Sequence, residues 1–229
     1  MKIVGLNKTT LLDYPEHVAA VLFTGGCNFR CPFCHNAPLV LYPERQAPVP
    51  EEAVFDLLRK RRGILEGVCV TGGEPTLQED LGSFLEKIKE LGYLVKLDTN
   101  GYQPEVLRGL MERRLLDYVA MDVKSSLRHY ERAAGVRSLE KPRLEESAEI
   151  LRGCGLPYEF RTTAVKGIHS AADFEEIGAW LRGSRAYFLQ TYRENENVIG
   201  EGGAAFPREE LENFAAIMRR HIQNVRIRG

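Results

Sequence analysis

The segment that decides the fold is an apolar run that leads into a cysteine-rich loop. It reads Val18-Ala19-Ala20-Val21-Leu22-Phe23-Thr24-Gly25-Gly26-Cys27-Asn28-Phe29-Arg30-Cys31-Pro32-Phe33-Cys34-His35-Asn36. Residues 18–23 have the length and the Val, Leu and Phe content of a buried strand. The loop that follows holds three of the chain's 5 cysteines. We therefore predict a strand that presents a cysteine loop at its carboxyl end.

Strand-like runs of the same kind recur along the chain, and each is followed by a helical pattern. The predicted strands cover 18–23, 68–71, 94–98, 118–123, 158–163 and 187–190, with a short one at 225–228. The predicted helices begin at Pro50 and Leu81 and cover 104–115, 143–151, 171–181 and 207–221. Serial strand–helix units form parallel sheets through right-handed crossovers.

Chain length then narrows the architecture. A complete eight-unit barrel takes about 250 residues, whereas this chain has 229 residues and six predicted units. We therefore predict an α/β fold, a partial (β/α)6 barrel of parallel strands with outer helices. A flat doubly wound sheet is the alternative, because periodicity does not separate the two.

Composition limits the class of protein. The formal net charge is -1, hydrophobic residues make up 44% and charged residues 28%, which is ordinary for a soluble globular protein. This balance excludes a nucleic-acid-binding coat and a polybasic membrane surface. With no run long enough to span a membrane, we predict a cytoplasmic protein. We expect one domain over 1–229, with the cysteine loop at 24–49 and a variable segment from about 191 to 229.

The cysteine spacing C-x3-C-x2-C predicts a metal centre. Cys27, Cys31 and Cys34 lie close enough to converge on one centre, and soft sulfur ligands select iron–sulfur clusters, zinc or copper(I). A four-iron cluster normally takes four cysteines, so three leave one iron open to a cofactor or substrate. The alternative is a structural zinc site with His35 as the fourth ligand. Adjacent residues such as Cys34 and His35 rarely bind one tetrahedral ion without strain.

This spacing, with Phe33 before the third cysteine, resembles the signature of the radical S-adenosylmethionine (SAM) superfamily. The resemblance implies a [4Fe-4S] cluster on the three cysteines, with SAM bound to the open iron beside Phe33. Gly72-Gly73-Glu74-Pro75 resembles the motif that receives the SAM amino group, although a Gly-Gly pair is also a common tight turn. The resemblance gives the remaining polar residues roles as well: Asn100 near the ribose, Arg161 facing the carboxylate, Asp98 and Asp122 at a monovalent cation, and Lys124 in the catalytic site.

The positions of these residues support the resemblance independently. Cys27, Gly72, Asp98 and Lys124 fall at the carboxyl ends of predicted strands, and Arg161 falls within one. In parallel α/β folds those ends share one rim, which carries the active site. Of the remaining cysteines, Cys69 lies in an apolar run and is expected to be a buried, inert thiol, and Cys154 has no predicted partner.

The N-terminal stretch narrows the resemblance to glycyl-radical-enzyme activating proteins. Residues 5–15, which end in Asp13-Tyr14-Pro15, together with Cys34-His35-Asn36 resemble the activating proteins of anaerobic ribonucleoside-triphosphate reductase. This implies hydrogen abstraction from a glycine of a partner enzyme, with a flavodoxin or ferredoxin as electron donor. Glu16 departs from the pattern, which commonly has glycine there. The alternatives are a radical SAM enzyme acting on a small molecule or another peptide, such as a 7-carboxy-7-deazaguanine synthase-like enzyme, and a zinc-binding module without enzymatic activity.

Overall fold

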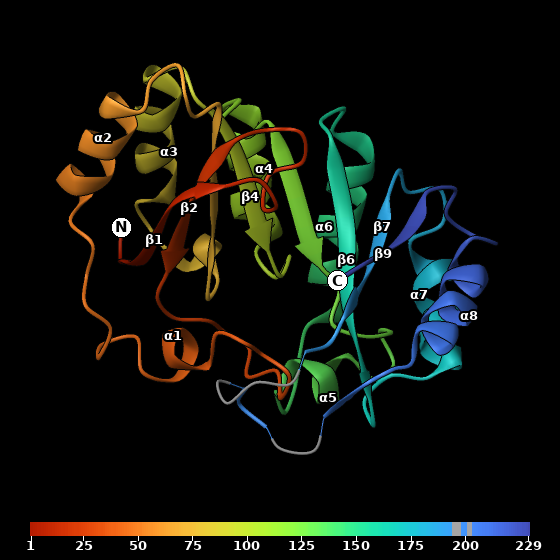
Figure 1. Cartoon of the computed structure of the whole chain (residues 1–229). Coiled ribbons are helices and arrows are strands. Elements are labelled where there is room, and N and C mark those ends of the chain that lie inside the picture. Colours follow the sequence, from red (N-terminus) through yellow and green to blue (C-terminus); the bar gives the residue numbers. More distant parts are fainter. Residues whose placement is uncertain (194–197, 201–202) are drawn as a thin grey trace. The chain divides into compact units, whose positions relative to one another are not determined.

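A computed structural model describes residues 1–193, 198–200 and 203–229 (Figure 1). Residues 194–197 and 201–202, which belong to the predicted variable segment from about 191 to 229, lie outside the described residues. The chain forms two compact units. The first comprises 1–28, 38–99 and 103–120, and the second comprises 29–37, 100–102 and 121–229. The cysteine loop is thus divided between them, and the expectation of a single domain stays a prediction.

The first unit contains a sheet with strand order β1-β2-β3-β4. Its strands are β1 (Ile3–Thr10), β2 (Ala19–Thr24), β3 (Gly67–Gly72) and β4 (Leu94–Thr99). β2, β3 and β4 are parallel, with Leu22 opposite Val70 and Val70 opposite Leu97. These three side chains are fully buried, as expected for parallel strands covered on both faces. The apolar runs at 18–23, 68–71 and 94–98 are confirmed as strands.

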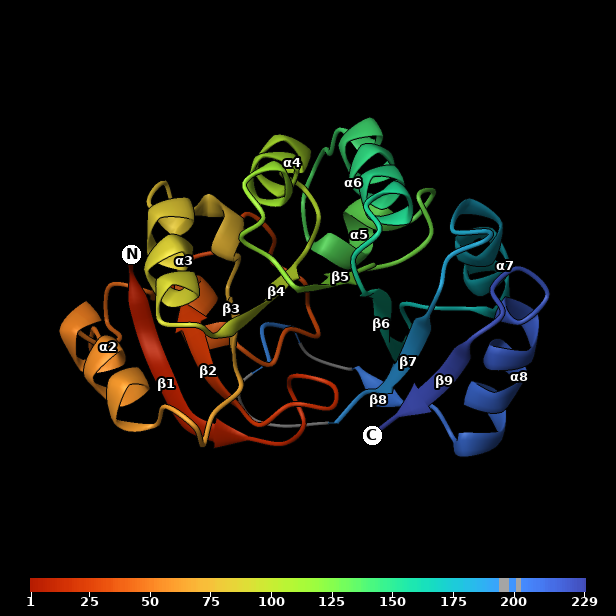
Figure 2. The same cartoon turned by 90° about the horizontal axis from the view of Figure 1, so that it is seen from above.

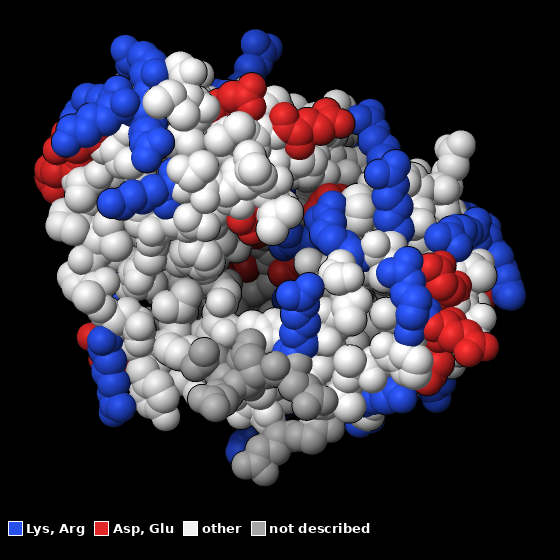
Figure 3. All heavy atoms as spheres, viewed as in Figure 1, with Lys and Arg blue, Asp and Glu red and all other residues white. Residues whose placement is uncertain are grey.

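The connections of the first unit are helical. They are α2 (Glu51–Lys60), the 3-10 turn η1 (Pro75–Leu77), α3 (Leu81–Glu90) and α4 (Pro104–Glu112), while α1 (Ala37–Leu41) begins in the second unit. α2 carries Glu51 and Glu52 in its first turn and Arg59 and Lys60 in its last, which suits the helix dipole at both ends. Figure 3 shows basic side chains over α2. The ring of Phe55 on α2 packs 5.3 Å from that of Phe84 on α3.

β1 was not predicted from the sequence. It pairs antiparallel with β2, at the edge of the sheet. Ile3 is buried, whereas Asn7 and Lys8 are exposed. An antiparallel edge strand needs only one buried face, so its polar content hid it in a search for continuous apolar runs.

The second unit has the strand order β6-β7-β9. The strands β6 (Tyr158–Lys166), β7 (Tyr187–Thr191) and β9 (Val225–Arg228) are parallel, and β8 (Ala204–Ala205) pairs antiparallel with β6. Its helices are α5 (Tyr130–Ala134), α6 (Lys141–Gly153), α7 (Ala171–Trp180) and α8 (Arg208–Met218). Figures 1 and 2 show α7 and α8 side by side next to β7 and β9, where the rings of Phe174 and Phe214 stack 4.6 Å apart.

One strand belongs to both units. β5 (Tyr118–Asp122) has its first three residues in the first unit and its last two in the second. Just before β5, the Asp117 N–H donates to the Val95 carbonyl of β4 at 2.8 Å. Just after it, the Val123 N–H donates to the Arg161 carbonyl of β6 at 2.8 Å. The predicted α/β class, with parallel strands alternating with helices, is confirmed.

None of the helices among the described residues is long and apolar enough to cross a membrane.

Candidate cofactor site

The turn after β3 is fastened to the start of the cysteine loop, within the first unit. The Gly73 N–H donates to the Thr24 carbonyl at 2.9 Å, and the Glu74 N–H donates to the Gly26 carbonyl at 2.8 Å. A Cβ added to Gly73 would lie 1.9 Å from the Gly26 oxygen. Glycine is therefore required at Gly73, because any side chain would push the two backbones apart.

Glu74 is held in one orientation beneath this turn. Its side chain is buried. One carboxylate oxygen accepts hydrogen bonds from the Thr76 N–H at 3.1 Å, the Thr76 hydroxyl at 2.6 Å and the Thr99 hydroxyl at 2.7 Å. Buried carboxylates are stable only when such donors compensate for lost water. Sequence reasoning identified Glu74 but missed both threonines, although Thr99 lies between the predicted site residues Asp98 and Asn100.

A second acid in the first unit is paired with a lysine that was not predicted. The Asp98 carboxylate accepts a hydrogen bond from Lys96 Nζ. Only 1% of Lys96 is exposed, which is rare for a lysine unless it is paired. Residues two apart on a strand point to the same face. A lysine inside an otherwise apolar run, two residues before an acid, was therefore the available signal.

The second unit brings Cys31 and Cys34 together in a tight turn. The Cys34 N–H donates to the Cys31 carbonyl at 3.0 Å, and just before the turn the Arg30 N–H donates to the Ala134 carbonyl of α5 at 2.8 Å. Cys27 belongs to the first unit. Among the described residues, no group of three His, Cys, Asp or Glu side chains forms a metal site by itself. The grouping of all three thiols therefore stays a prediction from their spacing.

Beside these cysteines lies a charged cluster made of Asp122, Lys124 and Arg161. Arg161 Nε donates to one Asp122 oxygen at 2.8 Å, and Lys124 Nζ donates to the other at 3.3 Å. Burial alone would raise the pKa of the Asp122 carboxyl, but the two cations outweigh burial and lower the pKa to about 2. Asp122 is therefore ionised at neutral pH and holds both cations in place.

Two of the cysteines also affect the pKa of Lys124. Burial would lower the pKa of its ammonium, but Asp122 raises it well above its usual range, and Cys31 and Cys34 add to the effect. The Lys124 ammonium therefore lies close enough to both cysteines to interact with them electrostatically. The predicted place of Lys124 in the site suits this position.

His169 is a buried residue of the site that the sequence motifs did not include. Its Nδ1 accepts a hydrogen bond from the Val165 N–H at 3.0 Å, and its Nε2 lies 2.8 Å from the Lys124 carbonyl, which can only accept. One acceptor and one donor nitrogen define a neutral imidazole, and burial lowers the pKa of His169 accordingly. The ring packs edge-on against Phe33 with centroids 5.9 Å apart. His169 thus links the cysteine turn to the backbone of Lys124.

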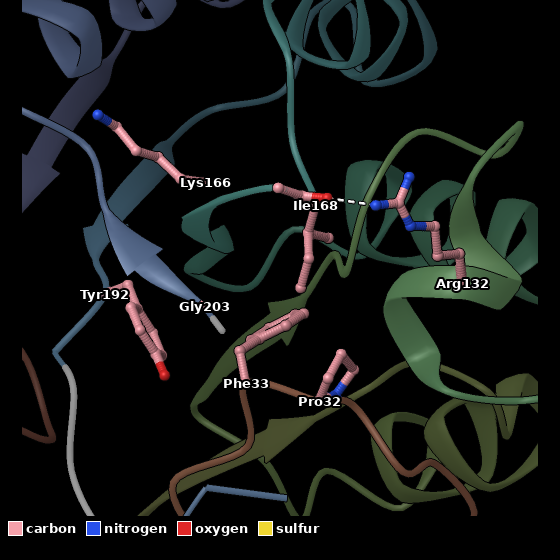
Figure 4. Close-up of a pocket in the computed structure, with 8 residues that line it drawn as sticks. Pro32, Phe33, Arg132, Lys166, Ile168, Tyr192 and Gly203 are labelled. Carbon is pink, nitrogen blue, oxygen red and sulfur yellow. Dashed lines mark hydrogen bonds between the residues drawn. The ribbon is translucent and has the colours of Figure 1, made fainter. Parts of the chain in front are cut away.

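A cavity of about 230 Å³ opens beside Phe33 within the second unit (Figure 4). Phe33, Pro32, Ile168 and Tyr192 give it apolar walls, and the backbone at Gly167 supplies polar atoms. Pockets that enclose a drug-sized ligand measure about 300–1,000 Å³. This cavity is smaller, and it suits a single flat ring system better than a peptide. Its remaining lining residues are Arg132, which donates to the Gly167 carbonyl, Lys166 and Gly203.

Two predicted site residues have local partners that bear on the alternatives. The Nε2 of His35 lies 2.7 Å from the Arg193 carbonyl, and the ring stacks on Tyr192 with centroids 5.4 Å apart. With Nε2 bonded to a carbonyl, a zinc ion in the alternative site would have to bind Nδ1 of His35. The side-chain carbonyl oxygen of Asn100 accepts a hydrogen bond from the Tyr102 N–H at 3.0 Å, which is a contact typical of Asn in a turn.

The sequence pattern of the radical SAM superfamily matches residues 21–181, which include the cysteine loop, the Gly72-Gly73-Glu74 turn and the charged cluster. The chain belongs to the radical SAM superfamily. This family implies an iron–sulfur cluster and SAM as cofactors. The predicted family is thereby confirmed.

Two relatives of this radical SAM protein come from archaea. A protein of Methanocaldococcus jannaschii named "Putative glycyl-radical enzyme activating enzyme" is 32% identical and aligns over 99% of this chain and 95% of its own length. A 7-carboxy-7-deazaguanine synthase of Thermococcus kodakarensis is 41% identical over 76% of this chain and 80% of its own length.

Solved structures share the fold. Streptococcus suis SuiB bound to S-adenosylmethionine aligns with a TM-score of 0.69 over 89% of this chain, at 18% identity. The chain spans about half of SuiB, 48% of its length. A domain of pyruvate-formate lyase-activating enzyme from Bacteroides vulgatus aligns with a TM-score of 0.57 over 71% of this chain and 99% of that domain, at 18% identity.

Proposed function

We propose that Cys27, Cys31 and Cys34 hold a [4Fe-4S] cluster and that the chain uses it to cleave SAM reductively. The thiol donor set, the ammonium of Lys124 beside two of the thiols, and the glycine turn that leaves no room for side chains all fit such a group. When bound, the reduced cluster and SAM supply a 5′-deoxyadenosyl radical. The protein's own residues bind, orient and shield these cofactors.

Different residues would bind different chemical groups of SAM. In the first unit, the Gly72-Gly73-Glu74 turn offers backbone atoms and a fixed carboxylate for the amino group of SAM. In the second unit, Arg161 presents a guanidinium, the natural partner of a carboxylate. The cavity beside Phe33, which Ile168 and Tyr192 also line, would accept the adenine. Asn100 remains the candidate for the ribose side.

We further propose that the hydrogen donor is a glycine of a partner enzyme, an anaerobic ribonucleotide reductase, with a flavodoxin or ferredoxin supplying the electron. The observation that carries this proposal is the alignment with the Methanocaldococcus jannaschii protein over nearly the whole of both chains. Glycine suits the reaction because no Cβ blocks the approach to its Cα hydrogen.

The test uses the full chain, reconstituted anaerobically with iron and sulfide. With dithionite and SAM, we expect 5′-deoxyadenosine and methionine. With an anaerobic ribonucleotide reductase added, we expect a glycyl radical by electron paramagnetic resonance, and none when the reductase glycine is replaced by alanine. SAM cleavage without any radical on the reductase would refute the activase proposal while leaving the cofactor proposal intact.

A second candidate is a 7-carboxy-7-deazaguanine synthase-like activity. The 41% identity to the Thermococcus kodakarensis synthase supports it, because this value exceeds that for the activating enzyme over a shorter part of the chain. Incubating the reduced protein with SAM and the substrate of that synthase, followed by mass spectrometry, separates the two. Formation of 7-carboxy-7-deazaguanine without a glycyl radical would favour this candidate.

A further inference from the structure

The expectation of a monovalent cation at Asp98 and Asp122 does not fit the side chains around these two acids. Asp98 accepts a hydrogen bond from the Lys96 ammonium within the first unit. Asp122 is paired with both Arg161 and Lys124 within the second. Each carboxylate therefore already has at least one positive side chain from its own unit, and a dissolved cation would meet like charge there.

Lys96 is a buried lysine whose ammonium has three partners. Its side chain is among the largest that are fully buried, and it lies on β4 with Cys69 of β3 directly opposite. Besides Asp98, its Nζ lies 3.7 Å from the Cys69 sulfur and 5.9 Å from the centre of the Tyr118 ring. A carboxylate, a sulfur and an aromatic face are all partners for a cation. They surround a single ammonium at a place that solvent does not reach.

We propose that Lys96 is a tethered counter-ion: its ammonium supplies the positive charge at Asp98 that a dissolved sodium or potassium ion would otherwise supply. The charge of this part of the first unit is then fixed by the chain and does not change with the salt around it. Lys96 acts through Asp98 and is a positioning residue. The expectation of a monovalent cation cofactor is replaced by an internal ammonium.

The first test compares the wild-type protein in sodium, potassium and choline chloride at equal ionic strength. Two quantities are measured: the thermal unfolding midpoint of the cluster-free protein and the KM for SAM of the reconstituted protein. A ligand that binds the folded state raises its stability in a saturable way, so we expect midpoints that coincide and KM values within about twofold. A saturable, ion-specific rise in the midpoint or fall in KM would overturn the proposal.

The second test removes the ammonium and asks whether a dissolved ion replaces it. In Lys96→Met, sodium or potassium should raise the unfolding midpoint and lower the KM for SAM at least about fivefold relative to choline. Lys96→Met/Asp98→Asn should lose this response, because the anion is gone. Lys87→Met is the matched control, since Lys87 forms an exposed pair with Glu51. A folded Lys96→Met protein with no ion response would refute the proposal.

The wild-type arm decides the question even if the lysine variant does not fold. Unfolding of the cluster-free protein requires no SAM cleavage and no partner enzyme. Failure of the tethered counter-ion is therefore distinguishable from failure of the proposed cofactor chemistry or of the activase proposal.

Discussion

Two acidic residues at successive strand ends have contrasting lysine partners. Asp98 lies near the end of β4 and takes Lys96, two residues earlier and inside the strand. Asp122 ends β5 and takes Lys124, two residues later and beyond the strand. The Lys96 side chain is 2% exposed and the Lys124 side chain 19%. The same two-residue step thus gives a fully buried ammonium in one pair and a partly exposed ammonium in the other.

The largest expected effect is a difference in activity between variants of the two cysteines that lie near these lysines. Cys34→Ala, next to Lys124, should lower 5′-deoxyadenosine formation more than about 100-fold, because a metal ligand matters at least as much as the groups around it. Cys69→Ala, next to Lys96, should retain its iron and most of its activity. Iron, sulfide and product are measured for both. Loss of iron in Cys69→Ala would reverse the comparison.

The next largest effect is a difference in how much each lysine contributes to the free energy of unfolding. Lys96→Met leaves the Asp98 charge without its buried partner and should cost about 3–5 kcal/mol of the free energy of unfolding. Lys124→Met should cost less, because its site is partly exposed and Arg161 still pairs with Asp122. Urea unfolding of the cluster-free variants measures both. Equal losses in the free energy of unfolding would show that the two lysines stabilise the protein to the same extent.

Arg161 tests the charged cluster of the second unit. Arg161→Ala should raise the KM for SAM roughly 10–100-fold, the worth of about 1.5–3 kcal/mol for hydrogen bonds to charged groups. Arg161→Lys keeps the charge without the fork and should recover only part of the loss. An unchanged KM in Arg161→Ala would mean that this guanidinium pairs with Asp122 and does not bind SAM.

Acid should weaken the cluster over a defined pH range. The pKa of the Asp122 carboxyl is about 2 in the folded protein, against 3.8 ordinarily. Its ionised form therefore contributes stability that is complete above about pH 4 and is lost as the pH falls towards 2. Asp122→Asn should show a smaller fall in the free energy of unfolding over this range. Parallel curves for the variant and the wild type would contradict the assignment.

The smallest expected effect is a gain in stability at Glu16, which belongs to neither of the two acid–lysine pairs. Glu16 has a φ of 67°, the left-handed conformation that costs a residue with a Cβ about 1–2 kcal/mol. Glu16→Gly should therefore raise the free energy of unfolding by at most about 1 kcal/mol, since glycine also gains freedom in the unfolded chain. Glu16→Ala is the control and should bring no gain. The N-terminal pattern, which commonly has glycine here, agrees with this backbone.

The sequence predicted the elements that bury continuous apolar faces and the residues in short motifs. β3, β4 and the Gly72-Gly73-Glu74 turn could be found because burial and tight turns leave patterns along the chain. Periodicity carries no information on which polar atoms meet between distant segments. The link from His169 to Lys124 therefore appeared only in three dimensions, whereas the two-residue spacing of Lys96 and Asp98 within one strand was an available signal. α5 escaped because its five residues are too short for a helical repeat.

The direct contact between Gly26 and Gly73 has a mechanical consequence. The two segments lie far apart in the sequence but share backbone hydrogen bonds with no side chain between them. A displacement of either segment is transmitted to the other as a rigid movement, which no side-chain rotation can absorb. A contact that restrains the turn carrying Glu74 would therefore also restrain the start of the loop that carries the thiols.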